Sequence, residues 1–331
     1  MSQLLRLHQF GSLDHLTLDT VPTRDLTAGE VRLQVKATSI TQDTLTYIQG
    51  HLHPGENTPK FPITLGYEPA GIVTAVGPGV AAKWLGQRVA PVGPYDFIRY
   101  GSLGDEIVVP AERLVQLPDN LDFAAAAALW VPYLTAYPVL TAALTVQSTV
   151  LITAATSTVG QAAIQMAKAV GATVIGTTRS AAKAQLLRKT TAIDHVIVTG
   201  ENDWTATLKS LTASRGIDLV FDAVGGTEVA SLTAAMAPGG TLIEYGVLAG
   251  LTAPLPVADL LSKALTIQGF TVSEIIENSA SRQQASQAIL AHVSQGDFHP
   301  TVAARYPLAD FRAAFTQLQR NDRIGRVVLT I

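Results

Sequence analysis

A short apolar run and a turn of small residues make up Val150-Leu151-Ile152-Thr153-Ala154-Ala155-Thr156-Ser157-Thr158-Val159-Gly160. An alanine-rich stretch with helical spacing continues to Gly171, and a second apolar run follows it up to Arg179. A strand, a small-residue turn, a helix and a second strand within about 30 residues form the βαβ unit that binds dinucleotides. Small residues let the backbone approach a pyrophosphate, and the helix N-terminus offers unpaired N–H groups.

The glycine pattern of this turn is incomplete. The motif G-x-G-x-x-G would fall on Ala155, Ser157 and Gly160, so only its last glycine is present. An ordinary buried βαβ unit that binds nothing is therefore an alternative on this stretch alone.

Composition narrows the class of protein. The 331 residues are enough for two domains, and 47% hydrophobic with 15% charged residues indicates a compact globular chain. A net charge of -3 without a Lys/Arg-rich run argues against nucleic-acid binding. The chain has no cysteine, which excludes disulfides and fits a cytoplasmic protein, and we expect no signal peptide.

One uncharged stretch is long enough to span a bilayer. Phe123 to Val146 covers about 24 residues. It contains Pro132 and Pro138 and several threonines, so we predict a buried helix interrupted by prolines and no membrane association.

Residues 1 to about 120 alternate short apolar runs with turns rich in Pro and Gly, which is typical of a barrel-like or strongly bent sheet. From Thr149 onward strand and helix patterns alternate. The strands are expected at Thr149–Thr153, Thr173–Thr177, His195–Val198, Asp218–Asp222, Thr241–Tyr245 and Leu265–Phe270. The helices are expected at Val159–Val170, Ser180–Lys189, Trp204–Ser214 and Thr227–Ala235. This alternation predicts an α/β fold with a doubly wound parallel sheet.

The pattern changes again after Phe270. Two helical stretches, Ser273–Gln295 and Ala309–Gln319, precede a final strand at Arg326–Ile331. Because they do not continue the alternation, we expect them to return to the first domain. The predicted domains are 1–122 together with 271–331, and 123–270.

Several blocks, in order, carry a resemblance. They are Gly66-Tyr67-Glu68-Pro69-Ala70-Gly71-Ile72-Val73, Gly86-Gln87-Arg88-Val89, Leu134-Thr135-Ala136-Tyr137, the 154–160 turn, Phe221-Asp222-Ala223-Val224-Gly225-Gly226 and Pro238-Gly239-Gly240-Thr241. With these blocks the chain resembles the medium-chain dehydrogenase/reductase superfamily, and within it the zinc-independent quinone oxidoreductase branch. The resemblance implies a Rossmann sheet inserted between the halves of a GroES-like, barrel-like domain, with nicotinamide in the cleft between them. It also implies a homodimer formed through edge strands, with Thr241–Phe270 as the candidate interface.

The zinc ligands of the superfamily are missing. At the positions where zinc alcohol dehydrogenases have Cys, His and Cys, this chain has Thr41, Tyr67 and, near the third position, Val131, so that Glu68 alone remains as a ligand. One carboxylate cannot form a catalytic zinc site with three protein ligands. Without a Lewis acid, reduction of a quinone or an activated C=C is easier than oxidation of an alcohol, because hydride addition at the β-carbon gives a delocalised enolate.

The end of the second strand of the βαβ unit indicates NADPH. Enzymes that prefer NAD have Asp or Glu there to hold the ribose 2′-OH. This chain has Thr178 and Arg179, with Lys183 one helical turn further on. Arg179 can pair with a 2′-phosphate, although both cations could also be plain solvated residues.

The resemblance implies further contacts with the cofactor. The pyrophosphate turn includes Ser157, Thr158, Val159 and Gly160, and the remaining expected contacts are Thr135, Gly246, Val247 and Phe270. Phe270 has an equally good interpretation as a core aromatic residue.

For catalysis, the candidates are Thr41, Tyr47 and Tyr67. The zinc-free members of the family often have Asn and Asp in the loop that matches Thr41 to Thr44, so this loop is altered here. Either tyrosine could donate a hydrogen bond or a proton to a substrate oxygen, or could be a packed aromatic residue.

Three functions therefore stay open. The first is an NADPH-dependent reductase of quinones or conjugated enones, small molecules in either case. The second is an enoyl-thioester reductase, and the third is a non-catalytic NADPH-binding sensor.

Overall fold

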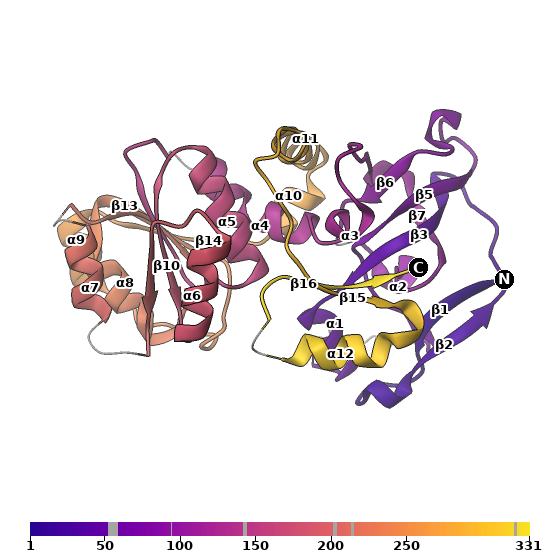
Figure 1. The fold of residues 1–331 in the computed structure, drawn as a ribbon, viewed down its shortest axis with the longest axis horizontal. Helices are drawn as coiled ribbons and strands as arrows, with labels where there is room; N and C mark the ends of the chain where they lie inside the picture. The colour runs from indigo at the N-terminus through magenta and orange to yellow at the C-terminus, as the bar shows by residue number, and fades with distance from the viewer. Residues whose placement is uncertain (52–58, 94, 142–143, 201–203, 213–214, 321–322) are drawn as a thin grey trace. The chain divides into compact units, whose positions relative to one another are not determined.

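The structure is a computed structural model that describes residues 1–51, 59–93, 95–141, 144–200, 204–212, 215–320 and 323–331 (Figure 1). The chain divides into two compact units. One, the barrel unit, is Met1–Val131 with Ser279–Ile331, and the other, the sheet unit, is Pro132–Asn278. The C-terminal segment thus joins the N-terminal half. The junctions lie at 131–132 and 278–279, whereas the sequence predicts them at 122–123 and 270–271.

The sheet unit is built on six parallel strands. They are β9 (Thr149–Ile152), β10 (Thr173–Thr178), β11 (His195–Val198), β12 (Ile217–Asp222), β13 (Met236–Glu244) and β14 (Thr266–Gly269). Their spatial order is β11-β10-β9-β12-β13-β14. This is the order of two βαβ halves that meet between β9 and β12, where the direction of winding reverses and ligands bind.

Helices cover both faces of this sheet, with α5 and α6 on one side and α7, α8 and α9 on the other (Figure 1). Right-handed crossovers require this, because the chain runs one way along the sheet from β9 to β11 and the other way from β11 to β14. The helices are α5 (Thr158–Ala169), α6 (Ala181–Thr190), α7 (Trp204–Leu211), α8 (Val229–Ala234) and α9 (Val257–Lys263), with η4 (Gly226–Glu228) before α8 and α10 (Ser273–Glu277) after the last strand.

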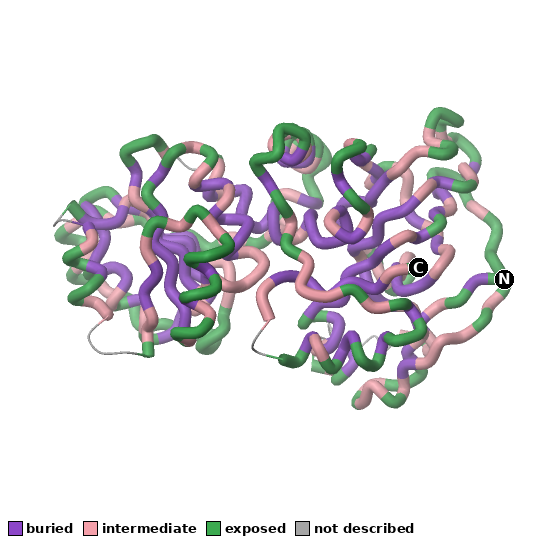
Figure 2. Tube along the Cα trace, viewed as in Figure 1, coloured by how far each residue is buried: buried purple, intermediate pink, exposed green. Residues whose placement is uncertain are grey.

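The core of the sheet unit is made by alternate residues of the strands. Leu151, Ile175, Val220 and Leu242 are buried in one cluster under these helices. Figure 2 shows the inner strands buried and the outward helix faces exposed, whereas the edge strand β14 is exposed. The expected parallel sheet is confirmed, and the strand and helix bounds agree to within a few residues, apart from the earlier start of β13 and an unexpected α9. Residues 213 and 214 of the expected helix Trp204–Ser214 lie outside the described residues.

The barrel unit contains two sheets. The larger has the order β15-β16-β3-β5-β6-β8, with β7 also paired to β3, and the smaller has the order β2-β1-β4. The strands are β1 (Ser2–Leu7), β2 (Leu16–Val21), β3 (Glu30–Ile40), β4 (Ile63–Thr64), β5 (Pro69–Val76), β6 (Arg88–Pro91), β7 (Glu106–Pro110), β8 (Leu114–Gln116), β15 (Val302–Pro307) and β16 (Arg326–Thr330). The last strand, β16, pairs antiparallel with β3. The C-terminal part of the chain thereby joins the sheet that the N-terminal part forms.

Short helices interrupt the part of the barrel unit that the sequence presents as all β. Thr41 caps α1 and Asp96 caps α2, each by accepting the N–H of the residue three positions on. The helices are α1 (Gln42–Ile48), α2 (Phe97–Tyr100), α3 (Phe123–Ala126), α11 (Ser279–Gln295) and α12 (Phe311–Gln319), with 3-10 turns η1 (Leu13–His15), η2 (Ala82–Trp84), η3 (Ala111–Arg113) and η5 (Leu308–Asp310). The long helical stretch expected from Ser273 breaks at Asn278, which is extended.

The proline-containing stretch after Phe123 forms two helices. The second, α4 (Trp130–Thr141), accommodates Pro138 in its interior and contains the junction of the two units. Within the described residues, no helix combines the length and the apolar character that crossing a membrane requires.

Candidate functional site

The turn between β9 and α5 is tightly held by small residues. The Ser157 hydroxyl caps α5 by accepting the N–H of Gly160 at 3.0 Å. A Cβ on Gly160 would lie 2.7 Å from the Cα of Ala155, so a side chain there would push the helix away from the turn. Ala154, just before the motif, takes up the left-handed region with φ of 45°, which glycine adopts more easily than alanine. The incomplete motif thus still folds into a tight turn at a helix N-terminus.

This turn fits the pyrophosphate of a dinucleotide. Ser157, Thr158 and Val159 are half-buried and begin a helix of 12 residues. The first N–H groups of a helix have no partner within it and carry partial positive charge, which suits an anion. Nearby, Gly225 has φ of 64°, and a Cβ there would make an ordinary contact with Glu244 Oε1 at 3.6 Å, at the same edge of the sheet.

Asp222 links the carboxyl ends of the two central strands, β9 and β12, through hydrogen bonds. It is the last residue of β12 and is fully buried. Its carboxylate accepts the Thr153 hydroxyl and the N–H groups of Val224 at 2.8 Å and Gly225 at 3.1 Å. The Thr153 hydroxyl in turn accepts the N–H of Ala223 at 2.8 Å. Because β9 and β12 flank the point where the winding reverses, this network fixes the floor of the candidate cofactor site.

A second carboxyl group stands at the end of the next strand. Burial, the Asp222 charge and a hydrogen bond with Asp222 raise the pKa of Glu244 to about 8. Its Oε1 is buried and has no hydrogen-bond partner among the described residues. The ring of Tyr245 stacks on Phe221 with 4.0 Å between centroids. Glu244 is therefore mostly protonated at neutral pH, and it lies half-buried beside Asp222 at the end of β13.

The residues expected to select NADPH lie just beyond β10. Thr178 is the last residue of the strand and is buried, and Arg179 next to it is exposed. Lys183 lies in the first turn of α6, where its N–H donates to the Ser180 hydroxyl at 3.3 Å. Burial and Asp222 raise the pKa of Glu228, and Arg179 opposes that shift. Arg179 is thus near this edge of the sheet, with its guanidinium open to a ligand.

The remaining expected cofactor contacts come from three elements. Gly246 passes close to the chain after β12, since a Cβ would lie 2.6 Å from the Ala223 carbonyl oxygen. Val247 beside it is 57% exposed. Phe270 follows β14 and donates its N–H to the Glu244 carbonyl at 2.9 Å, which places it at the same carboxyl edge. Thr135 is buried on α4.

In the barrel unit, Tyr67 and Thr41 form one polar cluster. The Tyr67 hydroxyl donates to Oδ2 of Asp43 at 3.2 Å and lies 3.5 Å from the Thr41 hydroxyl. Thr41 Oγ1 is also 3.0 Å from the Thr44 hydroxyl. Burial and then the Asp43 charge are the main causes that raise the pKa of Tyr67. The phenol therefore stays protonated well above neutral pH and can donate a hydrogen bond.

Tyr47 lies in a different environment. It is 6% exposed and belongs to an apolar cluster of the barrel unit. Its ring makes edge contacts with Phe10 and Phe97, with centroids 5.5 and 5.1 Å apart. Phe97 also contacts the Tyr67 ring at 6.4 Å. Of the three candidates, Tyr67 and Thr41 therefore share a polar cluster. Tyr47 lies outside it and is linked to Tyr67 only through the ring of Phe97.

The positions of the superfamily's zinc ligands do not fit a metal here. Glu68 is buried, and its carboxylate accepts Ser39 Oγ at 2.9 Å and Val131 N–H at 3.0 Å and pairs with Arg326 at 2.9 Å. Thr41, Tyr67 and Val131 supply two hydroxyls and an aliphatic side chain in place of the other ligands. In the portion of the chain that is described, no group of three or more His, Cys, Asp or Glu residues is placed so that it could hold a metal ion. Glu68 is thus a structural carboxylate.

Asp43, Glu244 and the role of Asp222 are not among the site residues that the sequence predicts. An acid that directly ends a parallel strand is a signal that was available for Asp222 and Glu244, since those ends meet at one edge. Asp43 gave no comparable signal, because its partner Tyr67 is 24 residues away and the pairing depends on tertiary structure.

Comparison with known proteins agrees with this arrangement. Residues 27–119 match the alcohol dehydrogenase GroES-like domain family, and residues 158–291 match the zinc-binding dehydrogenase family. A 2-haloacrylate reductase from a Burkholderia species is 29% identical over 332 residues, covering 98% of this chain and 97% of that protein. A quinone oxidoreductase from Pseudomonas aeruginosa is 32% identical over 291 residues, covering 86% of each.

A solved structure supports the fold. The quinone oxidoreductase of Pseudomonas syringae pv. tomato DC3000 superimposes with a TM-score of 0.85 at 26% identity, and the match covers 100% of both chains. The fold, the dinucleotide-type turn and the relatives agree. The chain is an oxidoreductase and belongs to the medium-chain dehydrogenase/reductase superfamily, in its quinone oxidoreductase branch.

Proposed function

We propose that this chain transfers hydride from NADPH to a quinone or an α,β-unsaturated carbonyl compound without a metal ion. The observation that carries the proposal is the cluster of Tyr67, Asp43 and Thr41, which offers a hydrogen-bond donor at the position where zinc relatives have a metal ligand. The printed names of the relatives, a quinone oxidoreductase and a 2-haloacrylate reductase, are consistent with this substrate class.

The choice of NADPH rests on charge. Thr178 and Arg179 stand where an NAD enzyme would carry an acid, and Lys183 adds a second cation within one helical turn. A guanidinium can make paired charge-assisted hydrogen bonds with a 2′-phosphate, whereas a ribose hydroxyl offers it little.

In the reaction, NADPH supplies the hydride when bound. Addition at the β-carbon breaks the C=C π bond, moves its electrons to the carbonyl oxygen and gives an enolate. Burial and the Asp43 charge keep the Tyr67 hydroxyl protonated, and its single proton turns from Asp43 to that oxygen, where it stabilises the charge as it develops. A proton from solvent then adds at the α-carbon, which completes a two-electron reduction. For a quinone the same donor serves the phenolate oxygen.

A consumption assay tests the proposal directly. NADPH oxidation is followed with a 1,4-quinone, a simple enone and an enoyl-CoA, each with and without a chelator. We expect turnover with the quinone or the enone that the chelator does not change. Turnover with the enoyl-CoA alone would favour the thioester reductase, and no turnover with any of them would favour a non-catalytic NADPH-binding protein.

We further propose that the chain forms a homodimer through β14. This strand ends the sheet, and all four of its residues are exposed. Large apolar side chains beside it are also exposed, by 87% at Leu251, 65% at Leu255 and 80% at Leu261. An unpaired sheet edge next to such a patch suits a second copy, whose own β14 would pair with it antiparallel about a twofold axis.

Light scattering on a sizing column tests the dimer. The double variant Leu251→Glu/Leu261→Glu should elute as a monomer, because it places four carboxylates in the shared interface. Leu85→Glu, which changes a 47% exposed leucine of the barrel unit, should leave the mass unchanged. A wild-type monomer at micromolar concentration would contradict the proposal.

A further inference from the structure

The barrel unit contains a cavity of about 470 Å³. The residues that line it play no part in the proposed reaction. Its walls come from β1, the segment between β2 and β3, β4, α2 and β7. Among the described lining residues five are cationic, Arg6, Arg24, Arg32, Lys60 and Arg99, whereas one, Glu106, is acidic. The whole chain carries a net charge of -3, so this concentration of positive charge is local.

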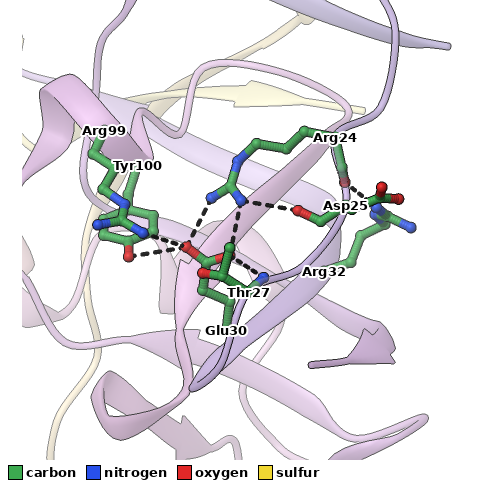
Figure 3. Close-up of polar contacts among 7 residues, drawn as sticks. All are labelled: Arg24, Asp25, Thr27, Glu30, Arg32, Arg99 and Tyr100. Carbon is green, nitrogen blue, oxygen red and sulfur yellow. Dashed lines mark hydrogen bonds and ion pairs between the residues drawn. The ribbon is translucent and has the colours of Figure 1, made fainter. Parts of the chain in front are cut away.

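The buried carboxylate of Glu30 holds two of these cations, Arg24 and Arg99, in place. It is 2% exposed, and Figure 3 shows Arg24 and Arg99 reaching its carboxylate from opposite sides. Arg24 makes a bidentate pair at 2.8 and 3.0 Å, and Arg99 adds a bond at 3.1 Å. The N–H of Thr27 at 2.9 Å and the hydroxyl of Tyr100 at 3.1 Å also donate to it.

The carboxylate of Glu30 is therefore saturated. A carboxylate offers about four lone-pair sites, and five donors already share them. Two guanidinium charges face one carboxylate, which leaves one positive charge in excess at this point. The Arg24 and Arg99 side chains are 42% and 56% exposed, so their remaining N–H groups can reach a ligand in the cavity.

Two of the other cations each have an acidic neighbour. Arg32 donates to the Arg24 carbonyl oxygen and lies 3.5 Å from Glu106, and Arg6 donates to the Pro62 carbonyl oxygen at 3.0 Å and lies 3.8 Å from Asp19. Lys60 is exposed at the rim. Four of the five cations are arginines, whose planar forks match the paired oxygens of a phosphate better than a lysine does.

We propose that this cavity is a binding site for a small phosphorylated ligand that carries at least two negative charges. The volume accommodates a small molecule, and Arg24, already fixed by Glu30, would bind without losing much side-chain freedom. The site is separate from the dinucleotide turn, which belongs to the sheet unit, and the proposal does not depend on the proposed reaction.

Inorganic pyrophosphate is the probe, titrated by calorimetry into the full chain at constant ionic strength with saturating NADP⁺, which keeps the dinucleotide turn occupied. We expect one saturable site per chain. Arg99→Met should weaken binding at least about tenfold, because a charge-assisted hydrogen bond is lost while Arg24 and Tyr100 still hold Glu30. Lys60→Met, at an exposed position, should weaken it in the same direction.

The matched control is Arg305→Met, which removes a 53% exposed arginine from the same unit. It should leave the affinity within twofold of wild type. The proposal is overturned if wild type shows no saturable binding in the presence of NADP⁺, if Arg99→Met and Lys60→Met both bind as tightly as wild type, or if Arg305→Met weakens binding as much as they do.

Discussion

The hydroxyl of Tyr67 donates to Asp43 at 3.2 Å, and this pairing joins the segment before β5 to the first turn of α1. The aspartate is an acceptor only, so the phenol must keep its proton to make the bond. Its charge also opposes ionisation of the phenol. A protonated hydroxyl that can turn its single proton from Asp43 to a developing enolate oxygen is what a metal-free reductase requires.

Replacing Tyr67 by Phe removes this donor and keeps the ring. We expect kcat for an enone to fall by about 100-fold, the lower end of the usual contribution of a positioned proton donor. The Kd for NADPH should not change, since Tyr67 belongs to the barrel unit. Tyr306→Phe, at a half-buried tyrosine of the same unit, serves as the control and should keep full activity. An unchanged kcat in Tyr67→Phe would remove Tyr67 from the mechanism.

Asp43→Asn tests the electrostatic part of the pairing. Because the Asp43 charge raises the pKa of Tyr67, its removal lowers that pKa, and the phenol ionises at lower pH. The alkaline titration profile of the tyrosinate absorbance should therefore move to lower pH. Asp297→Asn, which changes an acid paired with His292, should leave the profile in place. A profile that Asp43→Asn does not move would show that the charge has no influence on the titrating group.

Arg179→Gln should change the choice of cofactor. Loss of the guanidinium should lower kcat/KM for NADPH by about 10- to 100-fold, the value of one or two charge-assisted hydrogen bonds, and leave NADH almost unaffected. Lys189→Gln, at the exposed end of α6, is the control. A wild-type enzyme that prefers NADH would contradict the assignment of Arg179 to a 2′-phosphate.

Glu244 should make the stability of the protein depend on pH. Its pKa in the folded state is about 8, above its ordinary value of 4.5, so the folded state holds a proton that the unfolded chain releases. Stability from this group is complete below about pH 4.5 and is lost as the pH rises to about 8. Glu244→Gln should therefore gain thermal stability over wild type at pH 9 relative to pH 5. If the difference in melting temperature between Glu244→Gln and wild type were the same at pH 5 and pH 9, the burial of this carboxyl group would be contradicted.

Glu30 should act in the opposite sense. Hydrogen bonds from Arg24 are the largest cause that lowers its pKa below 4.5, so its contribution is present above that pH and is lost as the pH falls. Glu30→Gln should lower the free energy of unfolding at pH 7 by about 3 kcal/mol, because two arginines lose their buried partner. The difference from wild type, measured by urea unfolding, should shrink below about pH 4. A constant difference would mean that packing, not charge, explains the loss.

Much of the fold follows from local pattern. The alternation of strands and helices from Thr149 predicts the parallel sheet because both faces of such a sheet must be covered, and His195–Val198 is found with the expected bounds. The helices α1 and α2 are harder to foresee, since each is short and depends on one capping side chain, Thr41 or Asp96. The helix α9 lies within the candidate interface Thr241–Phe270, in an apolar stretch that the sequence alone cannot assign to an interface or to the core.

The candidate site is predictable where it depends on sequence position. Ser157, Gly160 and Arg179 lie at the ends of predicted elements, and the topology brings such ends to one edge. Side-chain pairs distant in sequence are different. Two such pairs are Tyr67 with Asp43 and Glu30 with Arg99. They form only because of how the strands and loops pack, so no spacing in the sequence predicts them.

The destination of the hydride tests the central claim most directly. NADPH labelled with deuterium at the transferred position of C4 is incubated with a simple enone, and the product is examined by NMR. A saturated ketone with deuterium at the β-carbon and a solvent proton at the α-carbon is the result that we predict. An allylic alcohol with deuterium at the carbonyl carbon would contradict the account, because it would show reduction of the C=O bond.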